Sequence, residues 1–88
     1  MPDPSDLPRV EMLTVFGYDW CEDTTASREW LTARGVPFTY VDMDRDAEAK
    51  EAVRGAGYLA TPTIVTPSGA VLVEPSEAEL EALVATLD

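Results

Sequence analysis

Residues 15–24 read Val-Phe-Gly-Tyr-Asp-Trp-Cys-Glu-Asp-Thr, and this segment decides the fold. The run at 10–16 is mostly apolar and rich in β-formers, which predicts a buried strand. A loop over 17–21 follows, and a helix is expected over 22–34. The chain's single cysteine, Cys21, therefore lies where the first strand passes to the first helix.

The remaining elements are expected from alternation, helical spacing and turn residues: strands over 38–43, 63–66 and 71–74, and helices over about 45–54 and from Ser76 onward. Asp44 is the expected cap of the second helix, and Ala26, Trp30 and Ala33 are the expected inner face of the first. The order β-α-β-α-β-β-α predicts an α/β fold. A parallel pair and a hairpin form a four-stranded mixed sheet flanked by three helices, which is the thioredoxin-like architecture.

Length and charge limit the function classes. The 88 residues fit one domain, expected over 9–88, and three prolines within 1–8 predict a flexible N-terminal tail. Six basic and seventeen acidic residues give a formal charge of −11, which disfavours nucleic acid and anionic membrane partners. The start of the chain lacks the pattern of a signal peptide, and one cysteine excludes an internal disulfide. We therefore expect a cytoplasmic monomer.

Cys21 is the residue type that carries chemistry at this position. At a helix N-terminus, unpaired backbone N–H groups and the helix dipole favour the thiolate, which is the nucleophilic form of cysteine. A buried structural cysteine is the commoner role for a lone cysteine. Polar neighbours on both sides favour the exposed, reactive interpretation instead.

Two motifs resemble the glutaredoxin family. Residues 15–24 resemble its active-site segment, and Ala60-Thr61-Pro62-Thr63 resembles its Thr-Val-Pro motif. Residues 68–76 look most like the actinobacterial mycoredoxin branch, and the similarity spans about residues 10–87. The resemblance implies the glutaredoxin form of the thioredoxin fold. It also implies roles for five residues: Cys21 as nucleophile, Pro62 as a cis-proline opposite it, the Thr61 backbone as a ligand contact, Trp20 as groove wall and Tyr18 facing the ligand.

The sequence departs from that family at three places. Thr24 replaces the second cysteine, which leaves a monothiol mechanism and a hydroxyl that can hydrogen-bond the thiolate. Three carboxylates surround Cys21 and oppose its ionisation: Asp19, Glu22 and Asp23. Tyr18 stands where glutathione-using relatives carry lysine, and the family's Gly-Gly motif after the hairpin is absent.

These departures lead to the hypothesis of an uncharged sugar thiol such as mycothiol as co-substrate, with bacillithiol and glutathione as alternatives. No bound cofactor or metal ligand is expected. The leading function is a thiol-disulfide oxidoreductase acting on protein or small-thiol mixed disulfides. An iron–sulfur cluster module, with one Cys21 from each of two copies, is a second hypothesis. A non-catalytic thioredoxin-fold adaptor is the third, supported by the acidic surroundings of Cys21.

Overall fold

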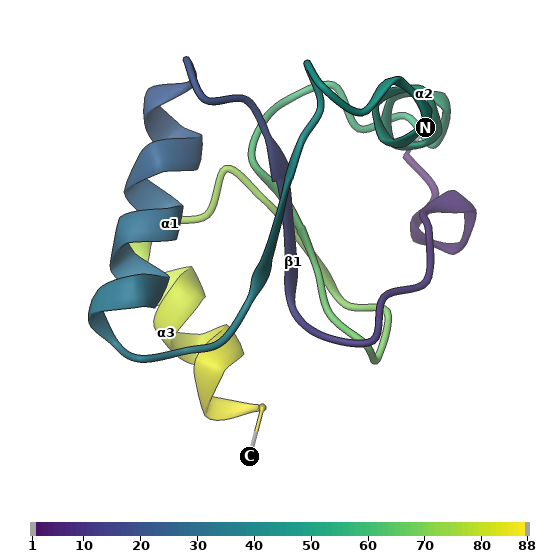
Figure 1. Ribbon diagram of the computed structural model, residues 1–88. Helices are drawn as coiled ribbons and strands as arrows, with labels where there is room; N and C mark the ends of the chain where they lie inside the picture. The colour runs from purple at the N-terminus through teal and green to yellow at the C-terminus, as the bar shows by residue number, and fades with distance from the viewer. Residues whose placement is uncertain (1, 88) are drawn as a thin grey trace.

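The computed structural model describes residues 2–87, in which a central sheet lies between two helical layers (Figure 1). The sheet contains β1 (Thr14–Gly17), β2 (Thr39–Asp42), β3 (Thr63–Val65) and β4 (Val71–Val73). Their order across the sheet is β2-β1-β3-β4. The β1–β2 pair is parallel, whereas β1–β3 and β3–β4 are antiparallel, so the mixed four-stranded sheet is confirmed.

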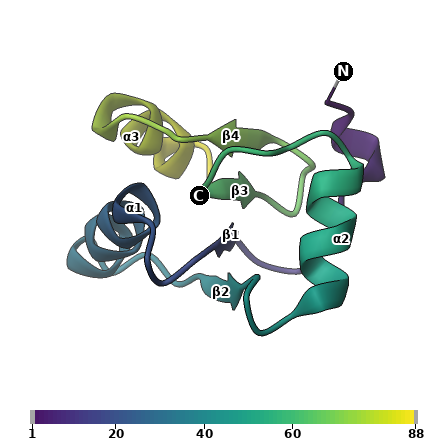
Figure 2. The ribbon, with the colours of Figure 1, turned by 90° about the horizontal axis from the view of Figure 1, so that it is seen from above.

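Three α-helices cover the two faces of this sheet. α1 (Glu22–Ala33) and α3 (Glu77–Ala85) lie on one face, and α2 (Ala47–Gly55) lies on the other (Figures 1 and 2). The order of these strands and α-helices along the chain agrees with the expected order β-α-β-α-β-β-α. Within residues 2–87, no helix combines the length and the apolar composition needed to cross a bilayer.

Alternation along the strands produces two separate cores. Val15 belongs to the core beneath α1 and α3, while its neighbour Phe16 belongs to the core beneath α2, because successive strand residues point to opposite faces. Ile64 and Val65 divide in the same way on β3. Burial on both faces explains why these strands are mostly apolar, with no alternation of apolar and polar residues.

Several local expectations for the helices differ from the structure. The buried face of α1 consists of Thr24, Ser27 and Leu31, whereas Ala26 and Ala33 are exposed. The cap of α2 is Asp46, whose side chain accepts from the Ala49 N–H at 3.0 Å; the expected cap, Asp44, lies in the preceding turn. The expected capping box of α3 is present, with Ser76 and Glu79 bonding reciprocally.

The N-terminal segment also differs from the expectation of a flexible tail over 1–8. Pro4–Asp6 form a short 3₁₀-helix, η1, capped by the Asp3 side chain, and the Asp3 N–H donates to the Ala56 carbonyl at 2.9 Å. Leu7 is buried in the core beneath α2. Burial of the Leu7 side chain and the backbone hydrogen bond from Asp3 to Ala56 hold the segment against the domain, so the packed region begins before residue 9. Met1 lies outside the described residues.

Candidate active site

The loop between β1 and α1 places Cys21 at the helix N-terminus. Cys21 is the N-cap of α1, with extended backbone angles, and its N–H donates to the Tyr18 carbonyl at 3.1 Å. Its side chain is half-buried and packs against the core beneath α2. The Cys21 side chain is therefore supported by the protein and remains partly exposed. α1, which begins at the next residue, starts at one end of the molecule (Figure 1).

The Thr61–Pro62 segment lies against this sulfur. The Thr61 hydroxyl donates to Cys21 Sγ at 3.2 Å, and the Thr61 carbonyl oxygen lies 3.7 Å from the same atom. The Thr61–Pro62 peptide bond is cis, and Pro62 is fully buried. The Pro62 carbonyl accepts from the Glu74 N–H at 2.9 Å, which fixes the segment to the residue after β4. Thus a threonine forty residues away in sequence becomes a direct neighbour of the thiol.

The electrostatic surroundings of Cys21 favour the thiolate. Partial burial raises the pKa of the thiol, whereas the nearby Thr24 hydroxyl, the hydrogen bond from the Thr61 hydroxyl and the backbone of Thr24 and Asp23 lower it. The second group of effects is the stronger, so the pKa is lowered overall. The pKa of the Cys21 thiol is thus lowered although Asp19, Glu22 and Asp23 lie nearby in the sequence, and a lowered pKa favours the nucleophilic form.

Thr24 is completely buried beneath the loop. Its hydroxyl makes no completed hydrogen bond within the described residues, although it lies close enough to Cys21 to lower the pKa of the thiol. A buried hydroxyl without a partner costs roughly 1–3 kcal/mol. A thiolate at Cys21 can accept from this donor, so ionisation would satisfy a group that is otherwise unpaired. Residue Gly17 makes room for it, because three atoms of the Thr24 side chain would lie 3.0 Å or less from any Cβ there.

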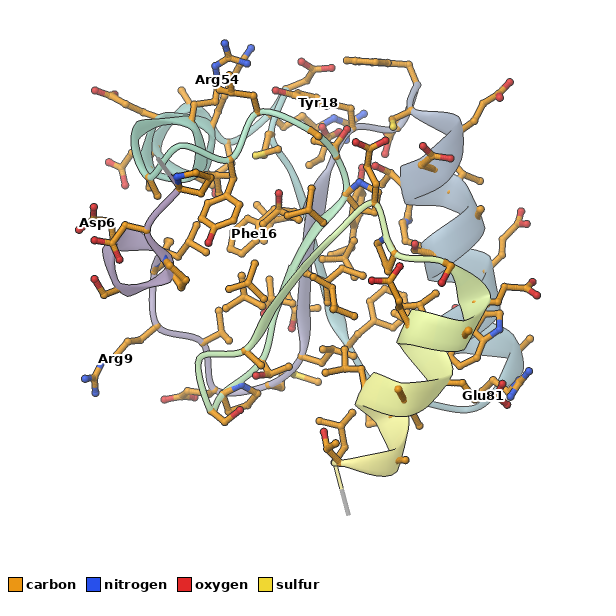
Figure 3. The ribbon with its side chains drawn as sticks, turned by 180° about the vertical axis from the view of Figure 1, so that it is seen from behind. Asp6, Arg9, Phe16, Tyr18, Arg54 and Glu81 are labelled. Atoms are coloured by element: carbon orange, nitrogen blue, oxygen red, sulfur yellow. The ribbon has the colours of Figure 1, made fainter. Side chains whose placement is uncertain are left out.

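Tyr18 and Trp20 form the aromatic part of the loop, and their exposure differs. Trp20 is 70% exposed, and its ring stacks on that of Tyr18 with centroids 4.7 Å apart. Tyr18 is only 7% exposed, so Trp20 rather than Tyr18 presents an aromatic surface to solvent. Figure 3 shows Tyr18 near the end of the sheet, above Phe16 and just beyond the end of β1. The Lys50 Nζ of α2 also lies 5.6 Å from the Tyr18 ring centroid.

Sequence reasoning missed three residues that hold the loop. The Trp20 indole N–H donates to the Asp44 carboxylate at 2.8 Å, and the Tyr40 hydroxyl donates to the Asp19 carboxylate at 2.8 Å. Arg28 also pairs with Asp19, at 3.6 Å. Asp44 and Tyr40 are separated from their partners by more than twenty residues, and no local pattern connects them.

The structure places a partly exposed thiol with a lowered pKa beside the Thr61–Pro62 segment, an arrangement that suits thiol chemistry. Within residues 2–87, no group of three or more histidine, cysteine or acidic side chains is arranged to hold a metal ion. The hollows found in the described surface lie elsewhere, one along α1 beside Phe38 and one between the N-terminal segment and the β3–β4 turn.

Comparison with known proteins agrees with this arrangement. The Glutaredoxin family model matches residues 13–68, which include Cys21 and Pro62. The chain belongs to the glutaredoxin family. No curated protein matches it significantly. Among solved structures, a mutant of the thioredoxin-like protein BC3987 is similar, with a TM-score of 0.77 and 22% identity over 86% of this chain and 97% of that one. This likeness confirms the thioredoxin-like fold, and the family membership supports a glutaredoxin-like redox role.

Proposed function

We propose that this glutaredoxin is a monothiol thiol-disulfide oxidoreductase that removes small thiols from proteins. The observation that carries the proposal is the contact of Cys21 Sγ with the Thr61 hydroxyl at the start of α1, in surroundings that lower the pKa of the thiol. A thiol that is both ionised and accessible is the requirement for attack on a disulfide. The chain holds one cysteine, so no second sulfur of the same molecule can complete the reaction.

The first step is attack of the Cys21 thiolate on the small-thiol sulfur of a protein mixed disulfide. A new bond forms between Sγ and that sulfur, the original S–S bond breaks, and the protein leaves as its thiolate. The leaving thiolate takes a proton from solvent. The protein sulfur is reduced, and Cys21 now carries the small thiol as a mixed disulfide.

The second step regenerates the enzyme with another molecule of the same small thiol. Its thiolate attacks the small-thiol sulfur on Cys21, the Sγ–S bond breaks, and Cys21 leaves as a thiolate. The products are the free enzyme and the disulfide of the small thiol, which an external reductase must reduce. The Thr61 hydroxyl and the donors at the start of α1 stabilise the leaving Cys21 thiolate in this step.

The cluster and adaptor hypotheses receive less support. One chain supplies one cysteine, so an iron–sulfur cluster would need a second copy and external thiols. The adaptor hypothesis rested on carboxylates that disfavour the thiolate, yet the pKa of Cys21 is lowered despite them. Absorption of visible light by the protein after anaerobic purification would favour the cluster hypothesis over the oxidoreductase.

A turnover assay on a peptide carrying a small thiol on its cysteine tests the proposal. The wild-type chain with excess thiol should release the peptide thiol, and Cys21→Ser should reduce the rate to that of the thiol alone. Thr25→Ala is the matched control, because Thr25 is a neighbouring residue of α1 and the hydrogen bonds of the Cys21 sulfur are made with Thr61. Wild-type turnover no faster than the thiol alone would contradict the proposal.

The choice of small thiol remains a proposal with mycothiol first. Tyr18 supplies no cation and is covered by Trp20, which supports an uncharged ligand. Lys50 lies beside the same ring and offers one charge that a carboxylate could use. Running the same assay with mycothiol, bacillithiol and glutathione should give the highest kcat/KM with mycothiol; a clear preference for glutathione would refute that assignment.

A further inference from the structure

The Asp19 carboxylate, two residues before Cys21, is held by two groups from other elements. The Tyr40 hydroxyl of β2 donates to its Oδ1 at 2.8 Å, and Arg28 of α1 lies 3.6 Å from the same oxygen. The Arg28 guanidinium also lies 3.6 Å from the centroid of the Tyr40 ring. The three side chains thus contact one another pairwise, which we term the Asp19 clamp.

The sheet topology separates this clamp from the thiol. Cys21 Sγ contacts Thr61, in the segment that enters β3, whereas Asp19 contacts Tyr40 on β2. β2 and β3 are the two neighbours of β1 and lie on its opposite sides (Figure 2). The carboxylate and the sulfur therefore contact residues from opposite sides of β1.

We propose that Tyr40 and Arg28 are positioning residues for the thiol chemistry of Cys21, because they hold the Asp19 negative charge on the β2 side of the loop. The inference rests on the proposed function and explains how a reactive thiol tolerates an acid two residues away. A like charge near a thiol disfavours the thiolate, and the effect grows as the distance falls. The positive charge of Arg28 partly offsets the negative charge of the Asp19 carboxylate, and the hydrogen bond from Tyr40 fixes the orientation of that carboxylate.

The other groups around the loop do not perform this task. Glu22 and Asp23 are exposed in the first turn of α1, where carboxylates stabilise the helix. Asp44 is bound by the Trp20 indole, and Lys50 lies over Tyr18. The pKa of the Tyr40 hydroxyl is raised by burial, by its hydrogen bond to Asp19 and by the negative charges of Asp19 and Asp42. The positive charge of Arg28 lowers this pKa, but the raising effects are the stronger. The Tyr40 hydroxyl is therefore protonated at neutral pH and can donate to Asp19.

A double-mutant cycle tests the clamp through the thiol rather than through turnover. The pH dependence of Cys21 alkylation by iodoacetamide is measured for Tyr40→Phe, for Asp19→Asn and for the double variant. Tyr40→Phe keeps the ring beneath Arg28 but removes the donor. It should raise the apparent pKa of Cys21 and slow alkylation at pH 7 by about twofold, a size typical of exposed charge effects. In the Asp19→Asn background the same substitution should have no effect.

Arg28→Gln provides a second route, with Arg34→Gln as its matched control. Both remove one positive charge, the first from within α1 and the second from its C-cap, but Arg34 pairs with Glu81 at 2.9 Å rather than with Asp19. Arg28→Gln should slow alkylation when Asp19 is present and should have no effect in the Asp19→Asn background. Arg34→Gln should not show this dependence on Asp19. Equal effects in both Asp19 backgrounds, or no effect in either, would overturn the clamp. Absence of turnover in the wild type alongside an intact cycle would instead count against the proposed function.

Discussion

Thr24 and Thr61 are the side chains that most directly set the chemistry of Cys21. Thr61 already donates to the sulfur at 3.2 Å, and Thr24 holds a buried hydroxyl without a completed bond within the described residues. Both donors stabilise the charged form more than the neutral one, because hydrogen bonds to ionised groups are stronger. A threonine in place of the second cysteine thus supplies a donor where a dithiol relative would hold a resolving sulfur.

Substituting Thr61 with valine should therefore slow the reaction of the Cys21 thiol with an alkylating agent. Thr61→Val keeps the branched shape and removes the donor, so the pKa of Cys21 should rise. Alkylation at pH 7 should slow by about two- to tenfold, the factor equivalent to a net hydrogen bond of roughly 0.5–1.5 kcal/mol. Stopped-flow alkylation measures this, with Thr32→Val on the exposed side of α1 as control. An unchanged rate for Thr61→Val would show that the contact does not stabilise the thiolate.

Sequence reasoning reached part of this site. It brought together Cys21, Thr61 and Pro62 through the family resemblance, and contacts between Cys21 and Thr61 are present. The role of Tyr18 in facing the ligand stays a prediction, and the structure shows its ring stacked on that of Trp20. The partners of Asp19 and Trp20 could not be found, because pairing of distant side chains depends on how β2 and its following turn lie beside the loop.

The junction of β1 with α1 depends on a close approach between a strand and a helix. Gly17 ends β1, and the buried Thr24 of α1 occupies the space that a side chain would need there. This approach brings the start of the helix against the sheet and fixes where the Cys21 sulfur lies. Glycine is thus required at residue 17 by packing, since its φ is not in the left-handed region.

Two alanine substitutions at glycine should have opposite effects on stability. Gly17→Ala forces Thr24 to move and should lower the free energy of unfolding by about 1–3 kcal/mol, the usual cost of overpacking. Gly55→Ala, at the end of α2, meets nothing within 4 Å and should raise it by roughly 0.4–1 kcal/mol. Urea unfolding followed by circular dichroism measures both. A neutral Gly17→Ala would contradict the proposed packing constraint.

The elements themselves were predictable in order and type, and less so in detail. The capping box of Ser76 and Glu79 depends on two residues three positions apart, so the sequence predicts it, and it is present. The inner face of α1 is predicted only in part: Trp30 packs against the core, but Ala26 and Ala33 are exposed. The helix contains few large apolar residues, so two faces fit the spacing. Tertiary packing selected the stripe with Thr24 and Leu31. The expected strand start at residue 10 was too early, since Met12 is 40% exposed and β1 begins at Thr14.

Across the whole molecule, apolar patterning determined the architecture and charge did not. Strands buried on both faces and amphipathic helices allow one arrangement of layers, which explains why the thioredoxin-like fold was predictable. The N-terminal segment was not, because Leu7 is a single apolar residue among prolines and acids and gives no periodic signal. The net charge of −11 left the ionisation of Cys21 undecided, since only the directions of nearby side chains settle it.

The pH titration of Cys21 by absorbance at 240 nm, with Cys21→Ser as the blank, tests the central claim most directly. Because the pKa of the thiol is lowered, the thiolate should form at lower pH than in free cysteine. The account predicts a midpoint below about 8.5, the ordinary value for this side chain, and an alkylation rate that rises with the same midpoint. A midpoint above that value would contradict it.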